Sequence, residues 1–279
     1  MDRTPLVDAA ALLARLGQDG PPLLLDVRWT LAGADGDAYR AGHLPGAVFC
    51  DLDADLAAAP GEGGRHPLPD PEDLVATLRR LGVGPSRDVV VYDGGSGAAA
   101  ARAWWVLRWA GHDRVAVLDG GLPAWVAAGG PLEAGDVAPV PAPDAVVRPG
   151  GLPTAGADDV LAGRAGTLLD ARAAERYRGE TEPIDPVAGH VPGALSRPTS
   201  TVYGPDGRFL AAAELREVLA VDGPATAYCG SGVTAAQLVL AGEVAGVDLA
   251  LYPGSWSHWV RDPSRPVATG ADPGSLTTT

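Results

Sequence analysis

Lysine is absent from this sequence of 279 residues, and all 21 basic side chains are therefore arginines. The acidic residues outnumber them, 35 to 21, which gives a formal net charge of −14 at pH 7. A surface with this excess of negative charge repels phosphate groups and anionic lipid headgroups. The composition therefore argues against nucleic acid or a membrane surface as a partner.

Cysteine is nearly absent as well, since Cys50 and Cys229 are the two in the chain. Two thiols far apart in the sequence make neither a disulfide framework nor a zinc site, so we expect no metal. No apolar run is long enough to cross a bilayer, and the first residues lack the basic and apolar segments of a signal peptide. We expect a cytoplasmic protein, because reducing conditions there keep cysteines as free thiols.

Four short motifs of the first half recur in the same order in the second half. The pairs are LLLDVR at 23–28 with LLDAR at 168–172, GHLPGA at 42–47 with GHVPGA at 189–194, VVVYDG at 89–94 with ATAYCG at 225–230, and LDGGLPAW at 118–125 with LYPGSWSHW at 251–259. The shared order and the drifting offset indicate two copies of one domain, with insertions in the loops.

Within each copy, short apolar runs alternate with segments of helical pattern. The runs of the first half are 23–26, 47–50, 87–92 and 115–118. The segment Asp70-Pro71-Glu72 is typical of a helix start, and Gly82 is typical of the end of that helix. A second helix is predicted over 98–110. Strands that alternate with helices indicate an α/β fold, in which each copy is a mainly parallel sheet flanked by helices.

Cys229 stands at the carboxyl end of a predicted strand, where ligands of parallel sheets gather. Gly230 and Gly232 let the chain turn sharply before a helix that begins near Thr234. The N–H groups of such a loop and the positive end of the helix dipole stabilise an anion at the first side chain. They lower a thiol pKa from about 8.5 into the range of about 3.5–7.5. We therefore predict a nucleophilic thiolate at Cys229, in preference to a buried structural cysteine.

The loop CGSGVT at 229–234 resembles the active-site loop of the rhodanese superfamily, and most closely that of its mercaptopyruvate sulfurtransferases. DVRW at 26–29, DGGLPAW at 119–125 and the two GHxPGA motifs extend the resemblance over nearly all of residues 5–268. It implies two tandem rhodanese-like domains. The expected division is an inactive domain at 1–135, a linker at 136–150, a catalytic domain at 151–270 and a flexible tail at 271–279.

The first copy has Asp93 where the second has Cys229, and an aspartate cannot carry a persulfide. We therefore expect the first copy to be inactive, with Asp93 as a helix-capping residue in preference to a catalytic carboxylate. His43 and His190 occupy matching positions in the two copies and are predicted to be structural. Cys50 is predicted to be structural as well. Arg172 is expected to form a structural ion pair.

The resemblance also implies the residues that bind the donor. Arg176, directly before an aromatic residue, matches a substrate-binding arginine, and a guanidinium suits a carboxylate or sulfonate. The N–H groups of the loop would hold the charged sulfur and the donor, which adds Gly230, Gly232, Val233 and Thr234 to the expected site. The mercaptopyruvate enzymes carry a second arginine shortly afterwards, in a Glu-Pro-x-Pro-Arg type of run. This chain has Glu182-Pro-Ile-Asp-Pro186 there, without an arginine.

Three more residues match a proposed serine–histidine–aspartate relay of the family. They are Ser231 in the loop, with His66 and Asp53 contributed by the inactive domain across the domain interface. The alternative for His66 and Asp53 is an ordinary place in a surface loop.

The family implies a sulfurtransferase that moves a sulfane sulfur from a small anionic donor to a thiol or cyanide acceptor through a Cys229 persulfide, without a cofactor. Thioredoxin is one protein that carries such an acceptor thiol. The uncharged Ser231 favours 3-mercaptopyruvate as the donor, whereas thiosulfate enzymes resemble Cys-Arg-Lys-Gly at this point. A thiosulfate:cyanide sulfurtransferase and a non-enzymatic sulfur-relay or binding module remain as alternatives. A phosphatase of the same fold would need an arginine six positions after the cysteine to bind phosphate. That position is Ala235, so the sequence argues against a phosphatase.

Overall fold

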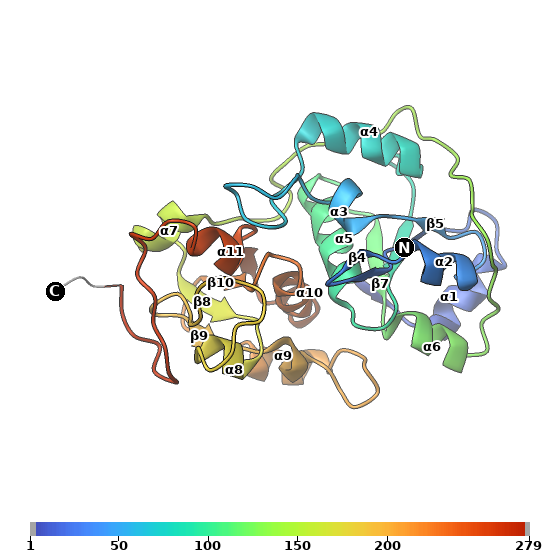
Figure 1. Ribbon diagram of the computed structural model, residues 1–279. Helices are drawn as coiled ribbons and strands as arrows, with labels where there is room; N and C mark the ends of the chain where they lie inside the picture. Colours follow the sequence, from blue (N-terminus) through green and yellow to red (C-terminus); the bar gives the residue numbers. More distant parts are fainter. Residues whose placement is uncertain (1–3, 277–279) are drawn as a thin grey trace. The chain divides into compact units, whose positions relative to one another are not determined.

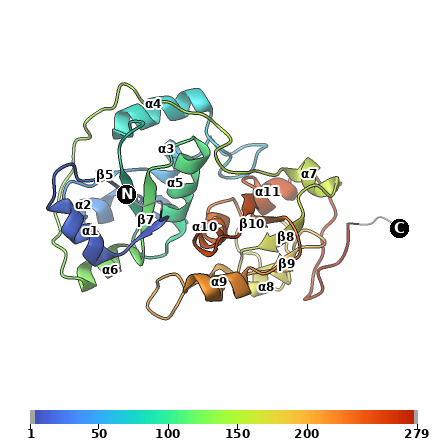
Figure 2. The same cartoon turned by 180° about the vertical axis from the view of Figure 1, so that it is seen from behind.

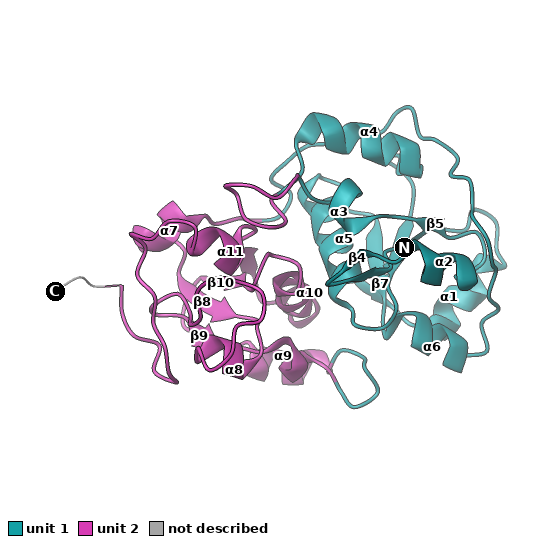
Figure 3. Ribbon diagram, in the orientation of Figure 1, with its two compact units in different colours: residues 1–58, 68–152, 204–209 teal, residues 59–67, 153–203, 210–279 magenta. Residues whose placement is uncertain are grey.

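The computed structural model describes residues 4–276, which fall into two compact units (Figures 1 and 3). Unit 1 holds residues up to 58, 68–152 and 204–209, and unit 2 holds 59–67, 153–203 and the residues from 210 onward. The sequence repeat predicts two domains but gives no sign of the two short exchanged segments, 59–67 and 204–209. The first of these brings a loop of the N-terminal half into unit 2.

Unit 1 is built on a parallel sheet with the strand order β1-β7-β6-β2-β5. Its strands are β1 (Leu6–Val7), β2 (Leu23–Asp26), β5 (Val48–Phe49), β6 (Val89–Tyr92) and β7 (Val115–Leu118). A separate antiparallel pair consists of β3 (Trp29–Thr30) and β4 (Gly33–Ala34). The helices are α1 (Ala9–Leu16), α2 (Gly36–Ala41), α3 (Leu52–Asp55), α4 (Pro71–Leu81), α5 (Ala98–Trp109) and α6 (Gly121–Ala127). In both views, α1 and α6 lie on one side of β7, and α3 and α5 on the other (Figures 1 and 2).

Unit 2 is built on a parallel sheet with the strand order β11-β10-β8-β9. Its strands are β8 (Thr167–Asp170), β9 (Leu195–Ser196), β10 (Ala225–Tyr228) and β11 (Leu249–Leu251). The helices are α7 (Ala157–Leu161), α8 (Ala174–Tyr177), α9 (Ala212–Val218), α10 (Ala235–Ala245) and α11 (Ser255–Trp259), with a 3₁₀ turn, η1, at Thr199–Val202.

The two sheets have the same strand order, since β7-β6-β2-β5 of unit 1 corresponds to β11-β10-β8-β9 of unit 2. An isolated parallel bridge between Thr154 and Leu251 stands where β1 pairs with β7. The predicted fold class, two α/β domains with mainly parallel sheets flanked by helices, is therefore confirmed.

Local signals in the sequence account well for α4. The Asp70 side chain accepts a hydrogen bond from Glu72 N, Pro71 occupies the first turn, and Gly82 ends the helix in the left-handed region. The apolar face that α4 buries consists of Leu74, Leu78 and Leu81. Helix α5 ends at Trp109, one residue before the predicted boundary.

The predicted structural residues lie in the core. His43 and His190 are fully buried, and each places Nδ1 within 2.9 Å of a backbone carbonyl oxygen. Cys50 is fully buried directly after β5, and burial raises the pKa of its thiol well above the ordinary value. Arg172 forms the expected buried ion pair with Asp170.

The expected linker and tail contain no helix or strand among the described residues. The segment 136–150 runs along unit 1, where Ala142 N donates to Arg79 O and Arg148 N donates to Ala110 O. In the expected tail, Leu276 packs against the core of unit 2, and residues 277–279 lie outside the described residues. Over residues 4–276, no helix has both the length and the apolar character needed to cross a membrane.

Candidate functional site

Cys229 lies where the sequence predicts it, in a tight loop between β10 and α10. Its side chain is buried, and Gly232 N donates a hydrogen bond to Sγ at 3.1 Å. Gly232 has φ +78°, and a Cβ on it would lie 2.3 Å from Pro253 O. Because only glycine fits this turn, the sequence Cys-Gly-Ser-Gly fixes the path that brings the Gly232 N–H onto the sulfur. Val233 and Thr234 follow in the loop, and in the described residues neither donates to Sγ.

The start of α11 holds the backbone of the cysteine. Cys229 N donates to Ser255 Oγ at 3.1 Å, and Cys229 O accepts from Trp256 N at 3.0 Å. Ser255 has φ +53°, which makes it the one described residue other than glycine with a positive φ. Its hydroxyl donates to Tyr252 O at 2.8 Å. A strained, buried serine of this kind is typical of functional sites, and sequence reasoning missed it.

Ser231 contacts one of its two expected relay partners within unit 2. Its Oγ lies 2.8 Å from Nδ1 of His66, which the segment 59–67 carries. Two backbone hydrogen bonds between Gly61 and Gly64 close this segment into a tight loop. A Cβ on Gly64 would lie 2.8 Å from Gly254 O, so the close approach of the loop to α11 requires glycine.

Asp53, the third member of the expected relay, lies in unit 1 near the start of α3. Both oxygens of its carboxylate lie 3.1 Å from Nε1 of Trp29, which donates to them. The part of Asp53 in a relay with His66 remains a prediction.

Arg176, the expected anion-binding residue, lies in α8 with most of its side chain buried. Its Nη2 donates to Oε1 of Glu182 at 2.6 Å, and its Nε donates to Oε2 at 3.2 Å. Burial opposes ionisation of Glu182, but the hydrogen bond from Arg176 holds the pKa of this carboxyl below its ordinary value. Arg176 Nη2 also lies 3.5 Å from Oδ2 of Asp185. The two carboxylates come from the run that lacks the second arginine of the family.

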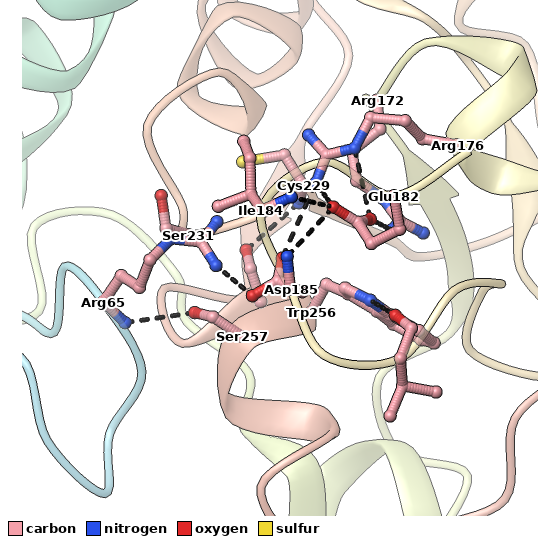
Figure 4. Close-up of polar contacts among 12 residues, drawn as sticks. Arg65, Arg172, Arg176, Glu182, Ile184, Asp185, Cys229, Ser231, Trp256 and Ser257 are labelled. Carbon is pink, nitrogen blue, oxygen red and sulfur yellow. Dashed lines mark hydrogen bonds and ion pairs between the residues drawn. The ribbon is translucent and has the colours of Figure 1, made fainter. Parts of the chain in front are cut away.

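A second guanidinium, that of Arg65, lies beside the loop, and sequence reasoning missed it (Figure 4). A Cβ on Gly230 would lie 2.8 Å from Nη2 of Arg65 and 3.7 Å from Nη2 of Arg176. Arg65 forms an ion pair with Asp185, and its backbone N donates to Ser257 Oγ at 3.1 Å. Its position directly before His66 is the signal that could have revealed it.

The wall of this site is rigid. The guanidinium of Arg172 lies 4.6 Å from the ring centre of Trp256, and its Nη2 donates to Gly189 O at 2.7 Å. The indole Nε1 of Trp256 donates to Val187 O at 2.9 Å. These fixed groups surround a thiol, two more guanidinium groups and a serine–histidine pair. Such a set can bind a small anion and attack it with sulfur.

Comparison with known proteins agrees with the fold and the repeat. The rhodanese-like domain family matches residues 8–128 and 156–262. A Mycobacterium tuberculosis protein whose name assigns it as a thiosulfate sulfurtransferase is 48% identical, over 95% of this chain and 97% of its own length. A Pseudomonas aeruginosa protein named as a 3-mercaptopyruvate sulfurtransferase is 47% identical, over 97% and 100%. The structure of the 3-mercaptopyruvate sulfurtransferase SseA from Escherichia coli matches with a TM-score of 0.80 at 32% identity, over 91% and 99% of the two chains. This chain therefore belongs to the rhodanese-like family and carries two copies of its domain.

Proposed function

We propose that this protein is a sulfurtransferase that takes a sulfane sulfur from a small anionic donor onto Cys229 and passes it to a thiol or to cyanide. The observation that carries the proposal is the loop itself, in which Gly232 N donates to Sγ while two guanidinium groups converge beside Gly230. The N–H groups of the loop stabilise the thiolate and the persulfide in turn. The names of the relatives support the same reaction class.

The transfer has two stages, with Cys229 as the carrier of the sulfur between them. In the first, the Cys229 thiolate attacks the outer sulfur of the donor, and an S–S bond forms as the donor's bond to that sulfur breaks. The electron pair leaves with the remainder of the donor, as sulfite from thiosulfate or as an enolate that takes up a proton to give pyruvate from 3-mercaptopyruvate. In the second, the acceptor attacks the outer sulfur, and Cys229 leaves again as a thiolate.

We propose that the pair formed by Ser231 and His66 donates the proton that the enolate takes up. The two are in hydrogen-bond contact, at 2.8 Å, and Ser231 lies two residues from the nucleophile. An imidazole in hydrogen-bond contact with a hydroxyl is suited to general acid catalysis near neutral pH. Sulfite needs no such proton, so the pair serves 3-mercaptopyruvate in particular.

We infer 3-mercaptopyruvate as the preferred donor, with thiosulfate as the alternative. The loop contributes no charge of its own, and Glu182 and Asp185 offset the charges of Arg176 and Arg65. A neutral site of this kind favours a monoanion over a dianion. For the acceptor, we propose a small thiol, a protein thiol such as thioredoxin, or cyanide, in the reducing cytoplasm that a free thiolate requires.

The test is to mix the protein with each donor in the absence of an acceptor and to measure the mass of its peptides. We expect a gain of one sulfur atom on Cys229 and none on the buried Cys50. The variant Cys229→Ser should gain no sulfur and show no turnover. Wild-type protein that gains sulfur from neither donor would point to the non-enzymatic binding module.

Steady-state kinetics with the two donors tests the donor assignment. We expect a higher kcat/KM with 3-mercaptopyruvate than with thiosulfate. An equal or higher value with thiosulfate would establish the alternative donor without affecting the transfer mechanism.

A further inference from the structure

The acidic residue Asp185 occupies the centre of the anion site. It forms ion pairs with both guanidinium groups that flank Gly230, through Oδ1 with Arg65 and through Oδ2 with Arg176 at 3.5 Å (Figure 4). Its side chain is only 4% exposed. The position that a donor's carboxylate or sulfonate needs, between two arginines next to the nucleophile, is thus held by a carboxylate of the protein.

This carboxylate is less firmly held than its neighbours. Glu182 accepts two hydrogen bonds from Arg176 and one each from the backbone N atoms of Ile184 and Asp185, at 3.1 Å. Oδ2 of Asp185, by contrast, is buried and accepts no hydrogen bond from any described residue. Burial raises the pKa of Asp185 even though the charges of Arg65 and Arg176 act in the opposite direction. An unsatisfied buried oxygen carries a desolvation penalty that is relieved when the group leaves the site.

The charged groups around Asp185 indicate which donor charge the site favours. Three guanidinium groups, on Arg65, Arg172 and Arg176, face three carboxylates, on Asp170, Glu182 and Asp185. A monoanion that takes the place of Asp185 keeps this cluster neutral. A dianion in the same place leaves one uncompensated negative charge in a site that is largely shielded from water.

We propose that Asp185 is a specificity-determining residue, an internal counter-ion that the donor displaces from Arg65 and Arg176. The exposed side chains of Ile184 and Val187 on either side show that this segment lies at the surface, where the carboxylate can turn toward water. Arg65 supplies the second guanidinium, which the run 182–186 lacks. The inference rests on the proposed function, because it names the group that competes with the donor of that reaction.

Binding in an inactive background separates this inference from the reaction itself. In Cys229→Ser, thiosulfate and 3-mercaptopyruvate bind without transfer, and calorimetry gives their Kd values. Adding Asp185→Asn should tighten thiosulfate about tenfold, and 3-mercaptopyruvate less, because the amide removes both the competitor and one negative charge. Adding Arg65→Gln instead should weaken both donors about tenfold.

The control is Glu180→Gln, which removes a carboxylate from the exposed ion pair between Arg178 and Glu180 and should leave both Kd values unchanged. Unchanged thiosulfate binding after Asp185→Asn would overturn the proposal, as would an equal gain for the two donors. Thermal unfolding checks the fold of each variant, and if Asp185→Asn does not fold, the Arg65→Gln result decides. A chain that binds both donors as expected but forms no persulfide would contradict the proposed reaction and leave the anion site intact.

Discussion

The loops that follow β6 in unit 1 and β10 in unit 2 occupy equivalent places but enclose different side chains. In unit 1, Oδ1 of Asp93 accepts from Gly95 N at 2.8 Å and from Gly97 N at 3.0 Å. Oδ2 accepts from Ala99 N at 3.2 Å and from Ala100 N at 3.3 Å, at the first turn of α5. The expected capping role of Asp93 is thereby confirmed. The carboxylate accepts from four N–H groups of its own loop and helix, which are therefore not available to a ligand.

In unit 2 the same position presents one sulfur in place of two oxygens. Sγ of Cys229 accepts from Gly232 N, and the N–H groups of neighbouring loop residues make no hydrogen bond to it. The comparison suggests a division under the proposed function: the loop of unit 1 holds a permanent anion, the Asp93 carboxylate, whereas the loop of unit 2 is proposed to hold an exchangeable one.

Several side-chain contacts that surround the two loops are the same in unit 1 and unit 2. The matched features are a tyrosine hydroxyl that accepts from a backbone N (Leu44 N to Tyr92, Val191 N to Tyr228), an aspartate–arginine pair (Asp26 with Arg28, Asp170 with Arg172) and a stacked tyrosine–histidine pair (Tyr39 with His43, Tyr177 with His190). In unit 1, Asp93 O accepts from Leu122 N at 3.0 Å. In unit 2, Cys229 O accepts from Trp256 N at the same distance, 3.0 Å. Differences in chemistry therefore arise from a few side chains and not from the scaffold.

The first such side chain is Arg176, which precedes Tyr177, whereas Ala38 precedes the matching Tyr39 in unit 1. Replacing Arg176 by alanine gives unit 2 the residue that unit 1 has at this position. Two charge-assisted hydrogen bonds to the donor, each of about 1.5–3 kcal/mol, are lost, so kcat/KM should fall by at least about a hundredfold, mainly through KM. Steady-state kinetics measures the effect with each donor. Arg178→Ala in the exposed pair with Glu180 is the control, and a loss no larger than that of the control would remove Arg176 from the donor site.

The second difference is Ser231, since unit 1 has Gly95 at the equivalent position. His66→Ala removes the imidazole partner of Ser231 and should slow kcat with 3-mercaptopyruvate by about a hundredfold, the lower end of the range of general acid catalysis. Transfer from thiosulfate should change less, because sulfite leaves without a proton. Asp53→Ala should act in the same direction if the expected relay extends to it. Equal slowing with both donors would indicate a structural role for His66, and an unchanged rate in Asp53→Ala would remove that residue from the relay.

Patterns of local sequence were sufficient to predict the fold and the position of Cys229 in a loop between a strand and a helix. The strand at 225–228, the glycines of the loop and the helix after it are all encoded within about a dozen neighbouring residues, and the repeat supplied the second domain. The capping residues of α4 gave its limits in the same way, because helix ends depend on local hydrogen bonds.

The contact of Ser231 with His66 was predicted only from the resemblance to the family, and the other contacts between distant segments could not be predicted. Arg65 reaches Gly230 because the loop 59–67 belongs to unit 2, and this requires the close approach of Gly64 to Gly254. No periodicity connects residues that lie this far apart in the chain. The positive φ of Ser255 was equally hidden, since the matching position in unit 1 is the permissive Gly121. The lack of an arginine in the run 182–186 is evident from the sequence, whereas the place of Arg65 beside Gly230 is not.

The smallest effect on activity is expected for Asp93→Ala, which removes the carboxylate from the loop of unit 1. Four backbone N–H groups lose their acceptor, and two of these groups, on Ala99 and Ala100, are buried; an unsatisfied buried group costs about 1–3 kcal/mol, and an exposed one less because water can replace the acceptor. We expect the free energy of unfolding to fall by about 2–4 kcal/mol while kcat/KM stays within about twofold of wild type. Denaturant titration and donor kinetics measure the two quantities, with Asp144→Ala on the exposed surface of unit 1 as the control. A large loss of transfer with unchanged stability would mean that the loop of unit 1 takes part in the reaction, and the division between a permanent and an exchangeable anion would then be wrong.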